Sequence, residues 1–215
     1  MAQIDYIATP MGSDVLVRPE KSKIYRYFAS KSLKAAKHVT VDSAALQTRV
    51  RILADCDSFL IQNGIDTIGT RFARRNKQKR SLIISPRGFD ANYRILELLT
   101  ARKKIKNSLG INFIYPFYEA SYLEKVCSKM ISADKNLGRI SKSEMYHLYK
   151  NARLVISIPK SDSSPRSVYE AIFCGAPVAV SYGQWIESLP KCMKARVITV
   201  SLADKKWFDK ALKKA

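Results

Sequence analysis

Residues 161–181, SDSSPRSVYEAIFCGAPVAVS, combine hydroxyl, acidic and basic side chains with an apolar run, and they follow the apolar segment RLVISIP. Pro165 suits the first position of a helix, and Ser164 before it is a typical N-cap residue. Gly175 is expected to end this helix, and Pro177 prevents its continuation. The serines therefore lie where the carboxyl end of an expected strand meets the N-terminus of a helix.

This position suits an anionic ligand. In open parallel sheets, ligands bind in the crevice beyond the carboxyl ends of the strands, where helix N–H groups and the helix dipole favour an anion. Glu170 lies about one to two turns inside the expected helix, and a carboxylate there can accept hydrogen bonds from two adjacent ribose hydroxyls. Together these features indicate a nucleotide. The alternative, that Ser164 is only a helix cap, stays open on the residues alone.

Apolar segments of strand length alternate with segments of helical period along the chain. In SKSEMYHLYKNA, Ser141 or Ser143 is expected to cap the helix, with Glu144 placed for a capping box. Repeated strand–helix–strand units predict an α/β protein with a Rossmann-like parallel sheet flanked by helices. Strands are expected at IDYIATP, HVTVDS, SFLIQNG, SLIISP, INFIYP, LVISIP, PVAVS and RVITVS, and helices at 21–37, 43–54, 90–106, 119–133 and over SKSEMYHLYKNA and PRSVYEAIFC, with a loop at MGSD.

The charge balance is strongly basic, with 38 Lys and Arg against 18 Asp and Glu and a formal net charge of +20. Such a balance indicates an anionic partner: nucleic acid, an anionic lipid surface or a phosphorylated substrate. Basic and aromatic residues occur together in 21–41 and 204–215, which favours a membrane surface. A cationic surface that only aids solubility is the alternative. The motifs typical of RNA-binding domains and zinc fingers are absent from the sequence, so nucleic acid is the least favoured partner.

Several protein classes do not fit the sequence. No uninterrupted apolar run approaches the roughly 18 residues of a membrane-spanning helix, and MAQIDYIATP lacks the features of a signal peptide. The cysteines at 56, 127, 174 and 192 form no CxxC pair and no metal-ligand cluster with either histidine. We therefore expect a cytoplasmic protein without a metal.

The segment 161–181 resembles the signature of the retaining glycosyltransferases of family four, which have the GT-B fold. That signature has two acids separated by seven residues, here Asp162 and Glu170, and then a CG-x-PV turn, here at 174–178. Residues 84–93 resemble the first strand and Arg-Gly loop of the donor domain, and 137–159 resemble the loop and helix before the signature. Upstream, MGSDVLV, VTVDSAAL and IQNGID resemble the end of the acceptor-side domain.

The resemblance implies a role for each matched residue. Arg87 would neutralise the departing diphosphate and Asp162 would lie near the hydroxyls of the transferred sugar, so both are expected to be catalytic. Glu170 would hold the ribose, and the backbone near Ile140 would receive the base. The other residues expected at the donor, in the Arg-Gly loop and at the helix N-terminus, are Gly88, Ser163, Ser164, Pro165, Arg166 and Ser167. No metal or other cofactor is expected, because cationic side chains and the helix dipole would stabilise the leaving group.

The chain departs from the family pattern at two positions of the site. Family members commonly have a lysine five or six residues after the arginine, where this chain has Asn92 and Tyr93. Arg94, Arg74 and Arg166 are the alternatives for the second phosphate contact. Many members also have a histidine where this chain has Met11.

The expected organisation is a partial N-terminal Rossmann-like domain over 1–66, a basic linker over 67–80, a nucleotide-sugar-binding domain over 81–203 and a basic amphipathic tail over 204–215. A domain of this type takes on the order of 150 residues, so the first is short. A fragment whose Met1 is an internal start is the favoured interpretation. The alternative is a subunit whose missing half comes from another chain.

The function that the resemblance implies is a glycosyltransferase, of hexosyltransferase type. It would transfer a sugar from a nucleotide-sugar donor to a polysaccharide or lipid-linked acceptor with retention. An anionic membrane surface is a further expected partner, with the protein attached peripherally to the inner face of the membrane. The alternative is a truncated, non-catalytic module that binds a nucleotide or a partner protein.

Overall fold

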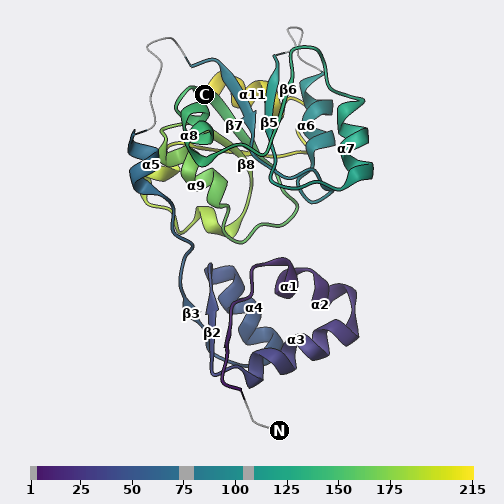
Figure 1. Cartoon of the computed structure of the whole chain (residues 1–215), viewed down its shortest axis with the longest axis vertical. Helices are drawn as coiled ribbons and strands as arrows, with labels where there is room; N and C mark the ends of the chain where they lie inside the picture. The colour runs from purple at the N-terminus through teal and green to yellow at the C-terminus, as the bar shows by residue number, and fades with distance from the viewer. Residues whose placement is uncertain (1–3, 73–79, 104–108) are drawn as a thin grey trace. The chain divides into compact units, whose positions relative to one another are not determined.

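The computed structural model describes residues 4–72, 80–103 and 109–215, which form two compact units (Figure 1). The first unit contains the chain up to Gly64 together with Ser161–Pro165 and Gly183–Ser188. The second unit contains Ile65–Lys160, Arg166–Tyr182 and Leu189–Ala215.

The first unit contains a small parallel sheet in the strand order β1-β2-β3. Short helices occupy Ser13–Leu16 and Arg18–Lys21, and the first overlaps the loop that the sequence predicted at MGSD. It begins there because Asp14 accepts hydrogen bonds from the backbone N–H groups of Met11 and Gly12 and so fixes the turn. The elements of this unit are β1 (Ile7–Ala8), α1 (Ser13–Leu16), α2 (Arg18–Lys21), α3 (Lys23–Ala35), β2 (His38–Val41), α4 (Ala44–Ala54), β3 (Phe59–Leu60) and the 3₁₀ turn η1 (Gln184–Ile186).

One face of this sheet packs on helices. Val39 and Val41 alternate with polar residues along β2 and are buried, as the period of two along a strand requires. Helix α4 begins where the Ser43 hydroxyl accepts a hydrogen bond from Leu46 N (3.3 Å). The buried apolar residues of this core are Val15, Leu33, Val39, Val41, Leu46, Val50, Leu53 and Ala54.

The second unit contains a six-stranded sheet in which all neighbouring strands are parallel (Figure 1). The strand order is β6-β5-β4-β7-β8-β9, so the chain moves outward from β4 to β6 and then returns beside β4 with β7. This is the Rossmann order, with its topological switch point between β4 and β7. The Rossmann-like parallel sheet that the sequence predicted is confirmed. Its strands are β4 (Leu82–Ser85), β5 (Ile111–Ile114), β6 (Lys135–Gly138), β7 (Ala152–Ser157), β8 (Val178–Ser181) and β9 (Val197–Val200).

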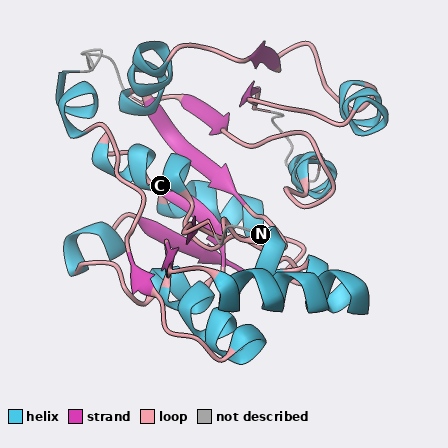
Figure 2. Ribbon diagram, turned by 60° about the horizontal axis from the view of Figure 1, so that its bottom comes forward, coloured by secondary structure: helices cyan, strands magenta, loops and turns pink. Residues whose placement is uncertain are grey.

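Helices cover both faces of this sheet, and Figure 2 shows how strands and helices alternate along the chain. Helices α8 and α9 contact strands β4, β7 and β8 on one face, while α6 and α11 pack together on the other. The helices are α5 (Thr67–Phe72), α6 (Ile95–Arg102), α7 (Ala120–Cys127), α8 (Lys142–Lys150), α9 (Arg166–Phe173), α10 (Lys191–Lys194) and α11 (Trp207–Lys214).

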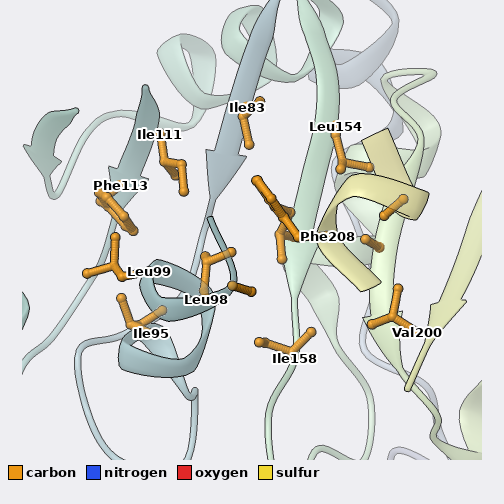
Figure 3. Close-up of a cluster of buried hydrophobic side chains, with 14 of the residues drawn as sticks. Ile83, Ile95, Leu98, Leu99, Ile111, Phe113, Leu154, Ile158, Val200 and Phe208 are labelled. Atoms are coloured by element: carbon orange, nitrogen blue, oxygen red, sulfur yellow. The ribbon is translucent and has the colours of Figure 1, made fainter. Parts of the chain in front are cut away.

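The larger apolar core lies between the sheet and the face formed by α6, α7 and α11. Figure 3 shows Leu98 and Leu99 of α6 and Phe208 of α11 gathered with strand residues, including Leu154 of β7. Trp207, Phe208, Ala211 and Leu212 are all buried, so the apolar side of the amphipathic tail is part of this core. Helix α11 therefore presents its lysines to solvent without an apolar face beside them.

Two further segments differ from simple expectation. Strand β6 was not predicted, because it is an edge strand with exposed Lys135 and Asn136 and no apolar alternation. The basic segment 67–80 begins with helix α5, which groups with the second unit, and residues 73–79 lie outside the described part of the chain.

Candidate functional site

Arg87 bridges the two strands of the switch point in the second unit. It follows β4, and its Nε donates a hydrogen bond to the Oγ of Ser157, the last residue of β7 (2.6 Å). The arginine is 9% exposed, and its guanidinium lies 5.4 Å from the centre of the Tyr93 ring. A cation is thus held in the crevice where ligands of such sheets bind.

Gly88 lets the loop after β4 pass close to an aromatic ring. A Cβ added at Gly88 would lie 2.4 Å from an atom of the Phe117 ring, which is too close for any side chain unless the ring moves. The Phe117 and Tyr93 rings are 5.8 Å apart. An arginine followed by glycine therefore places a cation beside an aromatic wall.

Helix α9 carries Glu170 into the site. The helix ends in a Schellman motif, with hydrogen bonds from Gly175 N to Ile172 O (2.8 Å) and from Ala176 N to Ala171 O (2.9 Å). Gly175 has a φ of 81°, which explains the glycine at this position. The helix begins at Arg166, one residue later than predicted, so Pro165 directly precedes it.

Glu170 is a buried carboxylate with two donors on one oxygen. The residue is 2% exposed, and its Oε1 accepts hydrogen bonds from the Lys142 ammonium and from the Tyr146 hydroxyl (3.2 Å). Both donors come from one face of α8, since residues four apart on a helix are neighbours. Ser141 and Glu144 form the complete capping box that starts this helix, which resolves the choice between Ser141 and Ser143.

A cavity of about 370 Å³ lies beside these groups in the second unit. Four cationic side chains line it, those of Arg87, Arg139, Lys142 and Arg166, together with the single carboxylate of Glu170. Its other lining residues, mostly apolar, are Pro86, Gly88, Tyr93, Ile114, Pro116, Phe117, Ile140, Met145 and Ser167. A ligand with an anionic part and a flat apolar part fits this combination of charge and wall.

The neutral groups behind the cavity stay protonated at neutral pH. Burial raises the pKa of the Tyr146 hydroxyl, and the Glu170 charge raises it further. Burial likewise raises the pKa of Tyr149 well above its ordinary value and that of the Cys174 thiol to about 11. These side chains are therefore hydrogen-bond donors or packing groups.

The cavity brings together six of the ten predicted site residues, namely Arg87, Gly88, Ile140, Arg166, Ser167 and Glu170. The other four, Asp162, Ser163, Ser164 and Pro165, lie in the segment that groups with the first unit. Of the alternatives for a second phosphate contact, Arg166 lines the cavity, Arg94 is not among its lining residues, and Arg74 lies outside the described residues.

Three functional candidates were missed from the sequence. Arg139 follows Gly138, which has a φ of 60° and ends strand β6, so an unpredicted strand places it. Lys142 and Tyr146 were seen only as helix residues. Their four-residue spacing in the segment before the signature was a signal, but the sheet order had to be known before that face of the helix could be related to Glu170.

A larger cavity of about 820 Å³ lies along another side of α8 and shares Ile140 and Lys142 with the first. Asp66, Gly69 and His147 are among its lining residues. We assign the site to the smaller cavity, because only there do several cations meet the buried carboxylate. Within 4–72, 80–103 and 109–215, no group of three or more His, Cys, Asp or Glu could hold a metal ion.

The fold of this chain agrees with solved structures of glycosyltransferases. HepE from Anabaena, in complex with UDP and glucose, aligns with a TM-score of 0.80 at 14% identity, covering 97% of this chain and 61% of that one. TarM from S. aureus aligns with a TM-score of 0.70 at 15% identity, covering 97% of this chain and 43% of that one. Sucrose-phosphate synthase from Thermosynechococcus elongatus aligns with a TM-score of 0.75 at 17% identity, covering 98% and 58%.

The chain therefore has a glycosyltransferase-like fold of the GT-B type. It spans about three fifths of the length of HepE and less than half of TarM. No protein-family model and no curated protein sequence matches it.

Proposed function

We propose that this chain carries the donor site of a glycosyltransferase that transfers a sugar from a nucleotide-sugar to a polysaccharide or lipid-linked acceptor with retention. The convergence of Arg87, Arg139, Lys142 and Arg166 with the buried Glu170 in one cavity carries this proposal. UDP is the nucleotide in the HepE complex. In this chain the cations match a diphosphate, and the apolar wall matches a base.

Each charged residue of the site has a separate role in this proposal. Arg87 stabilises the diphosphate as the bond between it and the anomeric carbon breaks, because it is fixed to Ser157 and needs no reorganisation during the reaction. Glu170 accepts hydrogen bonds from the ribose, and the wall near Ile140 receives the base. The start of α9 offers N–H groups to the phosphates. For Asp162, which groups with the first unit, we keep the expected role toward the hydroxyls of the transferred sugar as part of the proposal, apart from the cavity of the second unit.

In this proposal no metal ion takes part. The leaving group carries its negative charge into a cavity that already holds four cationic side chains, and charge-assisted hydrogen bonds from arginine suit phosphate oxygens. Addition of EDTA is therefore expected to leave transfer and nucleotide binding unchanged, measured against samples with added Mg²⁺ or Mn²⁺. Loss of activity in EDTA that Mg²⁺ restores would contradict this part of the proposal.

The first test is thermal denaturation with UDP, GDP, ADP and CDP. A nucleotide at about 100 times its dissociation constant adds about 2.7 kcal/mol to stability, which for this chain length is roughly 5–10 °C in Tm. One nucleotide is expected to give this shift with the wild-type chain and none with Glu170→Ala. Glu124→Ala, an exposed glutamate on α7, is the matched control. A shift that persists in Glu170→Ala would contradict the site.

An assay of sugar transfer distinguishes the proposed enzyme from the alternative, a non-catalytic binding module. Incubation with the matching radiolabelled nucleotide-sugar and a lipid-linked or polysaccharide acceptor is expected to release nucleoside diphosphate and to label the acceptor, with the α or β configuration preserved. Binding without any transfer would instead favour the non-catalytic module. The departures from the family pattern at Met11 and at Asn92 and Tyr93 support that alternative.

We also propose a peripheral contact with the inner face of an anionic membrane. Helix α3 supports it, because Ile24, Tyr27 and Phe28 are 73%, 55% and 64% exposed and lie among the lysines and arginines of this helix. None of the described helices is long and apolar enough to span a bilayer. Flotation with anionic vesicles is expected to carry the chain, and Phe28→Ser to reduce this. Equal flotation with neutral vesicles would contradict it.

A further inference from the structure

Lys142 and Glu170 form an ion pair with unequal partners. Glu170 is 2% exposed and fixed within α9, whereas the Lys142 side chain is 56% exposed. The lysine also lines the same cavity as the carboxylate. One partner can therefore leave the pair while the other stays in place.

The helix that carries Lys142 does not favour a cation at that position. Lys142 is the first residue of α8, directly after the N-cap Ser141, and the dipole of a helix disfavours positive charge at its N-terminus. The Lys142 ammonium lies 5.8 Å from the centre of the Tyr146 ring and hydrogen-bonds Glu170. The interaction that holds the ammonium in place is thus mainly the one with the buried carboxylate.

Both donors that Glu170 meets among the described residues bond to Oε1. A carboxylate oxygen has two lone pairs, so these two bonds fill it. A vicinal diol that donates to both carboxylate oxygens must displace one of these donors. Tyr146 is 1% exposed and cannot move aside without opening the core, so the lysine is the donor that leaves.

We propose that Lys142 is a displaceable counter-ion of the donor site, which neutralises Glu170 in the free protein and is exchanged for the ribose diol when the nucleotide binds. This role rests on the proposed function, because it takes Glu170 as the ribose site. The released ammonium remains in the cavity with Arg87, Arg139 and Arg166 and turns to the diphosphate. It thereby supplies a second cationic phosphate contact at a site where Asn92 and Tyr93, in place of the usual lysine, carry no positive charge.

The test compares uridine, 2′,3′-dideoxyuridine and UDP, or the corresponding set for whichever base binds. Dissociation constants are measured by NMR titration for the wild-type chain and for Lys142→Met. Without the competing ammonium, uridine is expected to bind about fivefold more tightly to the variant. The affinity gained by adding the diphosphate to the nucleoside is expected to fall about tenfold, because one charge-assisted hydrogen bond is lost.

The controls isolate the diol and the charge. Dideoxyuridine has no diol, so its affinity is expected to be the same for both proteins. Lys125→Met removes one exposed lysine from α7, outside the cavity, and is expected to leave all three affinities unchanged. Lys142→Gln is the second variant, in case Lys142→Met does not fold, and is expected to show the same pattern more weakly.

The outcomes separate this role from the proposed function. If UDP binds the wild-type chain but uridine binds Lys142→Met no better than wild type, the counter-ion role is wrong and the donor site stands. If dideoxyuridine gains as much as uridine, the variant has only added apolar surface and the role is equally wrong. If no nucleoside diphosphate binds either protein, the proposed function fails and this role fails with it.

Discussion

The sheets of the two units differ in how far helices cover their faces. In the second unit, helices pack on both faces, and all four residues of β5 are buried. In the first unit, Val39 and Val41 are buried against helices, but Ile7, Phe59 and Ile61 are each 61% exposed. The His38 and Phe59 rings meet edge to face on that exposed side. The same alternation of strand and helix has thus produced one sheet with two covered faces and one with a single covered face.

This difference in packing determines where a charged ligand site can form. A charged group can be held in a fixed position only where packed elements surround it, as around Arg87 and Glu170 in the second unit. The exposed apolar residues of the first unit instead form a surface of the kind that associates with other apolar surfaces. The cavity with its four cationic side chains and Glu170 accordingly belongs to the second unit.

The largest expected effect on the free energy of unfolding comes from truncating a buried aromatic residue. Phe208 on α11 is 1% exposed, and Phe28 on α3 is 64% exposed. Phe208→Ala is expected to lower the free energy of unfolding by about 4 kcal/mol, because a large core side chain is removed. Phe28→Ala is expected to change it by less than about 0.5 kcal/mol. Urea unfolding followed by circular dichroism measures both, and similar losses would show that the two aromatics are packed alike.

A second contrast lies in the ion pairs. In the second unit Asp134 pairs with Arg102, both side chains being at most 1% exposed, and it also accepts hydrogen bonds from Ile111 N (2.8 Å) and Ile131 N (2.9 Å). Asp134→Ala is expected to cost about 3 kcal/mol, because it leaves a buried guanidinium without its counter-ion.

The matched change in the first unit is Asp5→Ala, which removes the exposed pair between Asp5 and Lys37. It is expected to leave the free energy of unfolding within about 0.5 kcal/mol of wild type. Urea unfolding of both variants checks the difference. A loss from Asp134→Ala as small as that from Asp5→Ala would contradict the assignment of the buried pair.

Alkaline pH should destabilise the second unit. Burial raises the pKa of Cys174 from 9.0 to about 11, and the pKa values of Tyr122, Tyr146 and Tyr149 are also raised. Above pH 9 the unfolded chain releases the Cys174 proton while the folded chain keeps it, so stability falls as pH rises. We expect Cys174 to contribute a loss of about 2 kcal/mol between pH 9 and 11.

Single-tryptophan fluorescence can measure this loss. Trp185 groups with the first unit and Trp207 with the second, so Trp185→Phe leaves a reporter of the second unit. Urea unfolding of that variant at pH 8, 9.5 and 11, with and without Cys174→Ser, isolates the share of the thiol. An identical pH dependence with serine at 174 would show that the thiol contributes nothing.

The smallest expected effect concerns the helix caps. Ser22 caps α3 through one hydrogen bond, from Tyr25 N (3.2 Å), whereas Ser141 and Glu144 cap α8 reciprocally. Ser141→Ala is expected to cost about 1 kcal/mol and Ser22→Ala somewhat less. Ser143→Ala is the control within α8 and should have no effect, since the structure assigns the cap to Ser141. Hydrogen exchange of the first turns of α3 and α8 measures the losses, and equal protection in Ser141→Ala and wild type would contradict the cap.

Local sequence rules predicted much of the second unit correctly. Five of its six strands appear at the expected segments. The capping box of α8 and the end of α9 at Gly175 could be predicted because they depend on neighbouring residues in the chain. Strand β6 could not be predicted from the sequence. Its residues are polar and exposed, and it is a strand only because β5 offers it an open edge.

The residues of the candidate site also fall into those that the sequence could predict and those that it could not. Arg87, Gly88 and Glu170 could be found because each lies in a distinctive local segment. Arg139 and Lys142 could not, because nothing within their own segment relates them to Glu170 or Arg87. They join the site only because the order β6-β5-β4-β7 places the ends of these strands along one edge.

The sequence by itself determined the alternation of strands and helices, the capping box of α8, the glycine that ends α9 and the presence of an arginine and a carboxylate suited to a nucleotide. Those features depend on contacts within a few residues. The tertiary structure alone decided that α11 closes the core, that Arg87 spans β4 and β7, and that Lys142 meets Glu170. Each of these contacts joins residues far apart in the chain, so its geometry exists only once the sheet order has brought them together.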